Sequence, residues 1–114
     1  MSEEVWTDER CYIKELINSE AHPGASLAQC RVTAGTLTQN HALSVDEWYV
    51  LVSGEGMMHL GNQPAFKVAA GDRVYIPAGT AQQIRNTQDT DLVFHCLCMP
   101  RFEPGSYHSL ETAQ

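Results

Sequence analysis

Two runs of residues in the middle of the chain decide the fold. The first reads Gly35-Thr-Leu-Thr-Gln-Asn-His41-Ala-Leu43-Ser-Val-Asp-Glu47-Trp-Tyr-Val-Leu-Val-Ser-Gly54, and the second reads Gly71-Asp-Arg-Val-Tyr-Ile-Pro77-Ala-Gly79-Thr-Ala-Gln82-Gln-Ile-Arg-Asn86. Both contain short β-rich segments bounded by glycine, which is typical of strands joined by tight turns. Residues 35–86 are therefore predicted to form a small β-barrel with one internal polar site.

Short strand-like segments recur along the whole chain at a spacing of about 8–12 residues, the pattern of an all-β sandwich or barrel. The predicted strands are residues 10–16, 26–32, 36–41, 47–53, 57–60, 66–68, 73–76, 82–85 and 92–98. Only residues 103–113 have the character of a helical turn or two. We therefore expect one all-β domain with its barrel at residues 10–100, a mobile acidic lead at 1–9 and a tail at 101–114.

The composition restricts the partners of the chain. Its 114 residues carry a net charge of −7, which argues against binding to nucleic acid or to an anionic membrane surface. No apolar run approaches the roughly 20 residues of a membrane helix. The acidic N-terminus lacks the apolar core of a secretory signal, so a cytoplasmic location is expected.

The four cysteines are Cys11, Cys30, Cys96 and Cys98, and no two form a C-x-x-C pair. In a reducing compartment they are expected to be thiols rather than a disulfide framework. Cys96 and Cys98 lie two residues apart and share one face of a strand. One interpretation makes them small buried hydrophobes, and the other places a thiol beside the internal site as a soft ligand or reactive group.

The two central runs resemble the two motifs of the cupin superfamily, G-x5-H-x-H-x3/4-E-x6-G and G-x5-P-x-G-x2-H-x3-N. The matching positions are Gly35, His41, Glu47 and Gly54 in the first motif, and Gly71, Pro77, Gly79 and Asn86 in the second. Leu43 and Gln82 stand where the motifs have histidines. The resemblance implies a double-stranded β-helix, that is, a jelly-roll barrel.

The resemblance extends to residues 9–16 and 94–102, which look like those of small single-domain bacterial cupins. Members of this subgroup are often labelled mannose-6-phosphate-isomerase-like. The label reflects fold similarity and implies no activity.

In metal-binding cupins, three histidines and a glutamate hold iron, manganese, nickel, zinc or copper. The corresponding residues here are His41, Glu47 and Gln82, with Leu43 in place of the remaining histidine. One interpretation is a weakened site for a divalent transition metal (Zn, Mn, Ni or Fe), completed by a cysteine or by bound substrate. The alternative is a metal-free barrel in which the three side chains hydrogen-bond to one another.

The other histidines are weaker candidates. His95 is out of phase with Phe94 and Cys96, so it serves as a replacement ligand only if the strand phase is reversed. His59 is expected to face outward, whereas His22 and His108 are expected to be solvated.

The substrate pocket is predicted to be lined by Tyr49, Met58, Tyr75, Cys96 and Cys98, although simple core packing is the favoured explanation of such residues. A pocket of this kind suits a small polar or phenolic metabolite. His41 and Glu47 are the candidate catalytic residues, because each can move a proton.

Three classes of function follow. The first is an isomerase, a lyase or cyclase, or, least favoured, a dioxygenase, since iron oxygenases use two histidines and one carboxylate. The second is a metal-free binding or sensing module, and a third is a structural dimer with the barrel as scaffold. A homodimer is expected in each case, through the strand containing Ile13 or the outer face around Trp48 and Val50. No phosphate loop, nucleophile triad or nucleotide signature is present.

Overall fold

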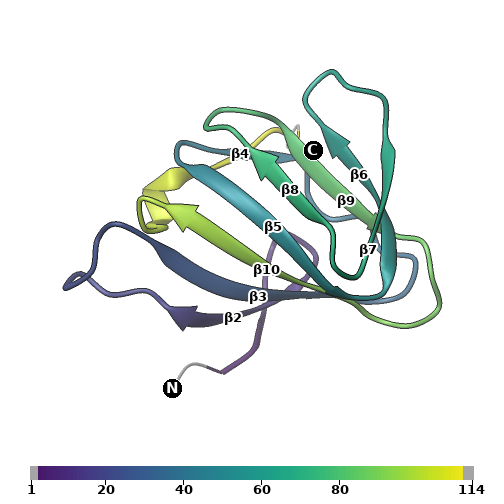
Figure 1. The fold of residues 1–114 in the computed structure, drawn as a ribbon, viewed down its shortest axis with the longest axis horizontal. Coiled ribbons are helices and arrows are strands. Elements are labelled where there is room, and N and C mark those ends of the chain that lie inside the picture. Colours follow the sequence, from purple (N-terminus) through teal and green to yellow (C-terminus); the bar gives the residue numbers. More distant parts are fainter. Residues whose placement is uncertain (1–2, 112–114) are drawn as a thin grey trace.

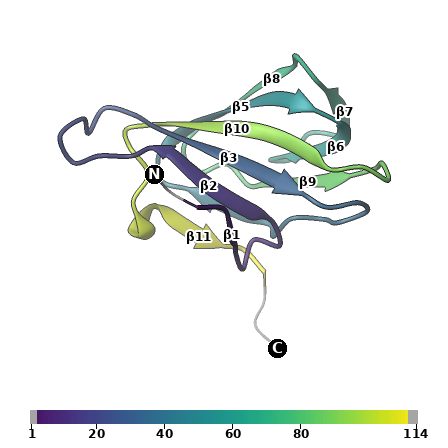
Figure 2. The same cartoon turned by 90° about the horizontal axis from the view of Figure 1, so that it is seen from below.

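The computed structural model describes residues 3–111 and consists of two antiparallel sheets that face each other and enclose the core. Figures 1 and 2 show the two layers from perpendicular directions. The six-stranded sheet runs in the order β1 (Val5–Trp6), β2 (Tyr12–Ile17), β3 (Ser26–Val32), β10 (Leu92–Met99), β5 (Asp46–Ser53) and β8 (Arg73–Ile76). The five-stranded sheet runs in the order β11 (Tyr107–Ser109), β4 (His41–Leu43), β9 (Gln82–Asn86), β6 (Glu55–Leu60) and β7 (Phe66–Ala69). The all-β prediction is confirmed.

Both ends of the described chain contribute strands that lie outside the predicted barrel limits of 10 and 100. Strand β1 pairs with β2 in the register Val5↔Ile13, so residues 3–9 do not form a separate lead. Strand β11 pairs with β4 in the register Ser109↔His41, so the expected tail closes one edge of the second sheet. The predictions at residues 1–2 and 112–114 fall outside the described residues. Strands of two or three residues are too short to show a periodicity.

Two further predictions on local structure need correction. The strand expected at residues 36–41 is an irregular segment that forms one bridge, Leu37↔Arg85, and the strand begins only at His41. Residues 103–113 hold a single 3-10 turn, Pro104–Ser106, before β11.

Buried and more exposed side chains alternate along most of β5 and β9, which places one face of each sheet in the core. In β5, Glu47, Tyr49 and Leu51 are buried, whereas Trp48 and Val50 are only half-buried on the outer face. The largest fully buried side chains include Phe94, Met58, Ile76, Ile84 and Leu92. Glu47 thus points into the core because it lies on the same face of β5 as the buried residues Tyr49 and Leu51.

Asn86 ties together elements that are far apart in the sequence. Its side chain is fully buried, and its Nδ2 donates to the carbonyl oxygens of Val32 at 2.9 Å and Thr90 at 2.7 Å. Its Oδ1 accepts from the Gln88 N–H at 2.9 Å. The bonds satisfy the buried amide of Asn86 itself and the buried Val32 carbonyl, which explains why an amide stands here.

The turn before β9 is anchored on the strands that carry the internal site. The Gly79 N–H donates to the Leu43 carbonyl at 2.7 Å, and the Ala78 N–H donates to Asp46 Oδ1 at 2.9 Å. With the turn docked in this way, Gln82 pairs directly with His41 across the β4–β9 ladder.

Within residues 3–111, the structure has no helix with the length and apolarity of a membrane span.

Gly54 is predicted to be required for stability. Its φ is +90°, and a Cβ built at this position lies 2.8 Å from the Asp91 carbonyl oxygen and 3.1 Å from the Leu92 Cα. Gly54→Ala should lower the free energy of unfolding by roughly 2 kcal/mol or more, measured by urea denaturation. Gly24→Ala is the control, because nothing lies within 4 Å of its Cβ position. Equal stability of the two variants would contradict the close approach at Gly54.

Candidate functional site

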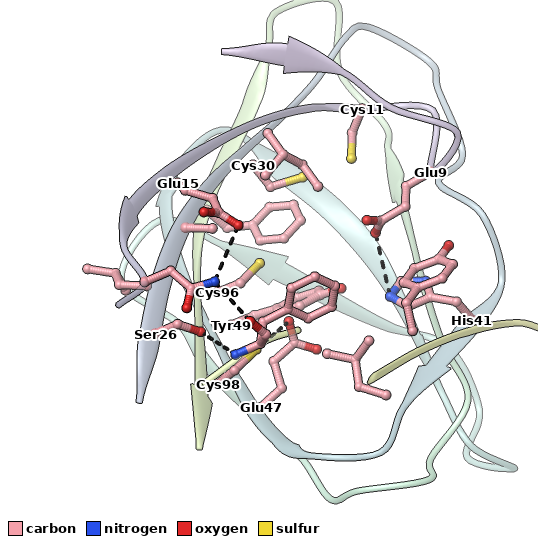
Figure 3. A pocket seen from close by; sticks show the side chains of 18 of the residues that line it. Glu9, Cys11, Glu15, Ser26, Cys30, His41, Glu47, Tyr49, Cys96 and Cys98 are labelled. Atoms are coloured by element: carbon pink, nitrogen blue, oxygen red, sulfur yellow. Dashed lines mark hydrogen bonds and ion pairs between the residues drawn. The ribbon is translucent and has the colours of Figure 1, made fainter. Parts of the chain in front are cut away.

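The space between the two sheets contains one pronounced pocket, with a cavity of about 90 Å³ (Figure 3). Its inner end is formed by His41, Glu47 and Tyr49, and it reaches the surface beside the exposed side chains of Glu15 and Ile17. The rest of its wall is mostly apolar or thiol, including Ile13, Leu27, Cys30, Leu43, Phe94, Cys96 and Phe102.

Glu47 is the deepest charged group of the pocket. It is 4% exposed; its Oε2 lies 3.9 Å from the Cys98 Sγ, and its Oε1 has no hydrogen-bond partner among the described residues. Burial disfavours the carboxylate and raises the pKa of Glu47 from 4.5 to about 7, although the nearby Gln82 amide acts in the opposite direction. Glu47 therefore lies close to its point of ionisation at neutral pH.

His41 faces Glu47 from the opposite sheet and is fixed on both sides of its ring. Its Nδ1 lies 2.8 Å from the Gln39 carbonyl oxygen, and the ring stacks on Tyr107 with centroids 4.8 Å apart. Because a carbonyl only accepts, Nδ1 carries the proton, and Nε2 of the neutral ring is an acceptor. Burial lowers the pKa of His41, which favours this neutral form.

Gln82 lies beside these groups but does not line the pocket. Its Oε1 accepts a hydrogen bond from the Tyr49 hydroxyl, and its Nε2 has no hydrogen-bond partner among the described residues. Its carbonyl oxygen is thus engaged by Tyr49, while the amide lies beside both His41 and Glu47.

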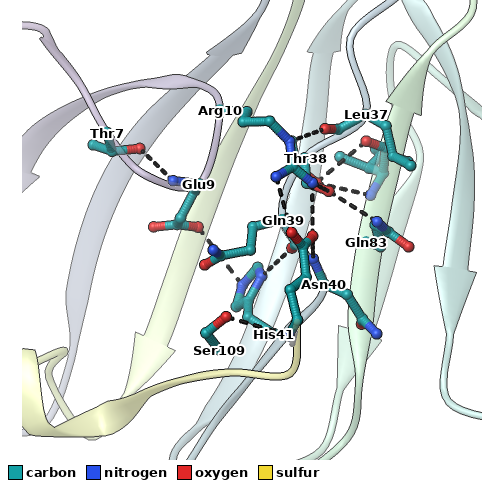
Figure 4. A network of polar contacts seen from close by, with 12 residues as sticks. Thr7, Glu9, Arg10, Leu37, Thr38, Gln39, Asn40, His41, Gln83 and Ser109 are labelled. Atoms are coloured by element: carbon teal, nitrogen blue, oxygen red, sulfur yellow. Dashed lines mark hydrogen bonds and ion pairs between the residues drawn. The ribbon is translucent and has the colours of Figure 1, made fainter. Parts of the chain in front are cut away.

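Glu9 is a site residue that the sequence analysis missed (Figure 4). Its Oε1 lies 3.7 Å from His41 Nε2, and burial raises the pKa of Glu9 from 4.5 to about 7. The next residue, Arg10, has a φ of +66°, and its guanidinium binds the Leu37 and Thr38 carbonyls and the Glu111 carboxylate. This turn directs Glu9 inward while Arg10 holds the two ends of the chain together.

The predicted pocket residues fall into three groups. Tyr49, Cys96 and Cys98 line the pocket. Met58 is fully buried in the core but does not line it. The prediction for Tyr75 is wrong, because Val74 and Ile76 take the inward positions of β8 and leave Tyr75 43% exposed against Trp48.

The remaining histidines lie outside the pocket. His95 Nε2 is 3.3 Å from Gln29 Oε1, and His59 is exposed. All four cysteines are free, and Cys11 and Cys30 join Cys96 and Cys98 in the pocket wall. Burial raises the pKa of Cys98 to about 12 and that of Cys96 well above its usual value, so both are protonated at neutral pH. Tyr107 is a second pocket residue that the sequence analysis missed.

Residues 28–99 match the family described as "Cupin domain". The chain belongs to the cupin family. A relative, an uncharacterised protein of Methanocaldococcus jannaschii, is 33% identical over 109 residues, covering 92% of this cupin and 86% of the relative.

Solved structures agree with this assignment at the level of the fold. An uncharacterised Klebsiella pneumoniae protein with a double-stranded β-helix domain has a TM-score of 0.78 at 15% identity, covering 93% of this chain and 89% of that one. The polyketide cyclase RemF of Streptomyces resistomycificus has a TM-score of 0.83 at 14% identity, covering 99% and 82%. The predicted double-stranded β-helix is therefore confirmed.

The side chains of this cupin do not fit the metal centre that the resemblance implies. Nε2 of His41 faces Glu9, Leu43 offers only hydrocarbon, and the carbonyl oxygen of Gln82 already accepts a hydrogen bond from Tyr49. Within residues 3–111, no group of three or more histidine, cysteine, aspartate or glutamate side chains is arranged to hold a metal ion. Catalytic zinc sites typically have three protein ligands.

Glu47 should make stability depend on pH. A pKa of about 7 in the folded state and about 4.5 in the unfolded state means that its stabilising contribution is complete below pH 4.5 and is lost as the pH rises through 7. We therefore compare the free energies of unfolding of Glu47→Gln and the parent protein by urea denaturation. The difference between them should change by about 3 kcal/mol in favour of Glu47→Gln when the pH is raised from 4 to 8.

The control for this measurement is Glu55→Gln, which changes a partly exposed glutamate on β6 that pairs with Lys67. Its stability relative to the parent should be nearly constant over the same range. A Glu47→Gln difference that is equally constant would mean that the Glu47 carboxyl is not buried as described.

Proposed function

We propose that this cupin binds a small organic molecule in the barrel pocket and moves a proton on it, with Glu47 and His41 as the acid–base groups. The observation that carries the proposal is Glu47 Oε1, a buried carboxyl oxygen in the pocket wall with no partner among the described residues. Leaving such an atom unpaired costs about 1–3 kcal/mol or more, so a ligand that pairs with it gains this energy.

The wall of the pocket defines what the ligand looks like. Phe94, Phe102 and Tyr107 offer aromatic surface, and Glu47 offers one deep polar contact. We infer a ligand with a small apolar or aromatic body and one hydrogen-bonding head group, which agrees with the polar or phenolic metabolite expected from the sequence.

Two proton-transfer groups enter the pocket from opposite sheets, Glu47 from β5 and His41 from β4. One group can remove a proton from one side of a bound molecule while the other returns a proton on another side. This arrangement supports an isomerisation, an elimination or a cyclisation. The fold similarity to a polyketide cyclase makes cyclisation a reasonable first assay.

The second candidate is binding or sensing without turnover. It is favoured by the two replaced motif histidines, Leu43 and Gln82, which leave few groups in the pocket able to assist a reaction. The protonated thiols of Cys96 and Cys98 are also poor nucleophiles.

Membership of the mannose-6-phosphate-isomerase-like subgroup remains a hypothesis, and it does not support a phosphorylated substrate. Among residues 3–111, no lysine or arginine lines the pocket, and phosphate recognition normally uses such cations.

Substitution of Glu47 separates the two candidates. For a compound found to turn over, Glu47→Gln should lower kcat by 10²- to 10⁴-fold with a smaller change in KM, and His41→Ala should also lower kcat. Glu55→Gln should leave both constants unchanged. A compound that binds in the pocket and is never consumed would support the binding module, and full activity of Glu47→Gln would refute the proposed role of Glu47.

The poor fit to a metal and the proposed dimer each have a separate test. Elemental analysis of protein purified without chelator, compared with His41→Ala, measures the metal content. A stoichiometric amount of metal that this substitution abolishes would contradict the poor fit of the ligands.

For dimerisation we propose the outer face of β5 and β8, where Tyr75 and Val52 are exposed beside Trp48. Sedimentation velocity should show a dimer, and a monomer at every concentration would refute this proposal.

A further inference from the structure

The pocket contains acidic side chains with no cation to balance them. Glu47 lies in its depth, Glu9 lines it with a side chain that is 22% exposed, and Glu15 lies at its mouth. None of the lysines and arginines in the part of the chain that the structure describes lines it. His41 contributes no compensating charge in its neutral form, which burial of the ring favours by lowering its pKa.

Lys14 lies on the pocket strand β2, but it alternates with the lining residues Ile13 and Glu15 and does not line the pocket itself. Three arginines around the pocket are engaged with other groups. Arg10 binds Glu111 and two backbone carbonyls. Arg31 pairs with Glu4 at 2.7 Å and Asp91 at 3.1 Å on the outer face of the sheet. Arg101 binds Asn18 and Glu103, each at 2.7 Å. An anionic ligand would therefore meet carboxyls and no counter-charge.

The Glu9 and Glu47 carboxyls have few hydrogen-bond donors beside them, and those near Glu47 are the Gln82 amide and the Cys98 thiol. Glu47 Oε1 has no partner in the described structure, and the Glu9 carboxyl lies 3.7 Å from an imidazole nitrogen that is itself an acceptor. Both carboxyls are held in place by the fold, Glu47 by the phase of β5 and Glu9 by the Arg10 turn. The missing partner is thus a group rich in donors and positively charged.

An ammonium group has these properties, with three N–H donors, a positive charge and no acceptor. The rings of Tyr49 and Phe94, whose centroids are 4.4 Å apart, lie in the same wall and add favourable surface for a cation. The cavity of about 90 Å³ restricts the rest of the molecule to a few carbon atoms or one ring.

We propose that the pocket selects a small protonated amine, with the ammonium group between Glu9 and Glu47 and an apolar or single-ring body against the aromatic wall. The proposal rests on the proposed function, because it names the class of ligand that the same pocket takes. According to this proposal, carboxylates and phosphates do not bind in the pocket, and neutral alcohols bind less tightly than amines.

Two matched series of probes test this selection at pH 7.5 with the full chain. The first is butylamine, 1-butanol and butanoate, and the second is benzylamine, benzyl alcohol and benzoate. Binding is followed by amide chemical shifts in protein-observed NMR, with the signals of residues 41, 47, 49 and 96 as reporters of the pocket. We expect an amine in at least one series to bind at least tenfold more tightly than its alcohol, and both carboxylates to leave these signals unchanged.

Glutamine variants test whether the carboxyls of Glu9 and Glu47 cause the preference for an amine. Glu9→Gln and Glu47→Gln should each reduce the amine-to-alcohol affinity ratio at least fivefold, because each keeps the shape of the side chain and removes its charge. Glu55→Gln, outside the pocket, should leave the ratio unchanged. Glu9→Gln still tests the proposal if Glu47→Gln does not fold, which thermal unfolding of each variant will show.

The outcomes separate the two proposals. Alcohols that bind in the pocket as tightly as amines would overturn the selection for an amine and leave the pocket a small-molecule site. Carboxylates that bind there would overturn it in the same way. If no member of either series shifts the pocket signals at millimolar concentration, while the same amide signals are observed and assigned, both proposals are contradicted. An amine that binds equally to the parent, Glu9→Gln and Glu47→Gln would overturn the assignment of the ammonium to these carboxyls.

Discussion

The burial of one carboxyl, that of Glu47, is the constraint on which the rest of the site depends. Strand β5 places Glu47 on the same face as Tyr49 and Leu51, so the alternation that builds the core also puts an ionisable group inside it. Desolvation then raises its pKa to about 7, and one of its oxygens lacks a partner among the described residues. Tyr49, Gln82 and Cys98 are arranged around this group, and the pocket lies in front of it.

Some positions of the cupin motifs in this chain stabilise the barrel, and others determine which ligands the barrel can bind. Gly54, Gly79 and Asn86 act through backbone geometry or buried backbone hydrogen bonds, and the chain keeps them. Leu43 and Gln82 occupy two positions that supply metal ligands in metal-binding relatives, and neither replaces an imidazole. The fold is therefore retained without the usual ligands, and a carboxylate from the N-terminal segment, Glu9, faces His41 instead.

The sequence predicted the all-β double-stranded β-helix, because motif spacing and the period of two act over short distances. His41, Glu47 and Gln82 are all buried, although Gln82 does not line the pocket. Tyr75 was misplaced because a one-residue error in strand phase moves a side chain to the other face. Glu9 and Tyr107 could not be found in this way. Each reaches His41 through pairing between the ends of the chain and the barrel, and the β1 and β11 strands that make this pairing are too short to leave a pattern.

The most direct test of this account is the ionisation of Glu47 in the folded protein, followed by the side-chain carboxyl ¹³C signal and assigned by its loss in Glu47→Gln. The account predicts a midpoint near pH 7, well above the ordinary value of 4.5. A midpoint near 4.5 would mean that the carboxyl is solvated or already paired. In that case it would not provide the buried, unpartnered acceptor on which the proposed ligand site depends.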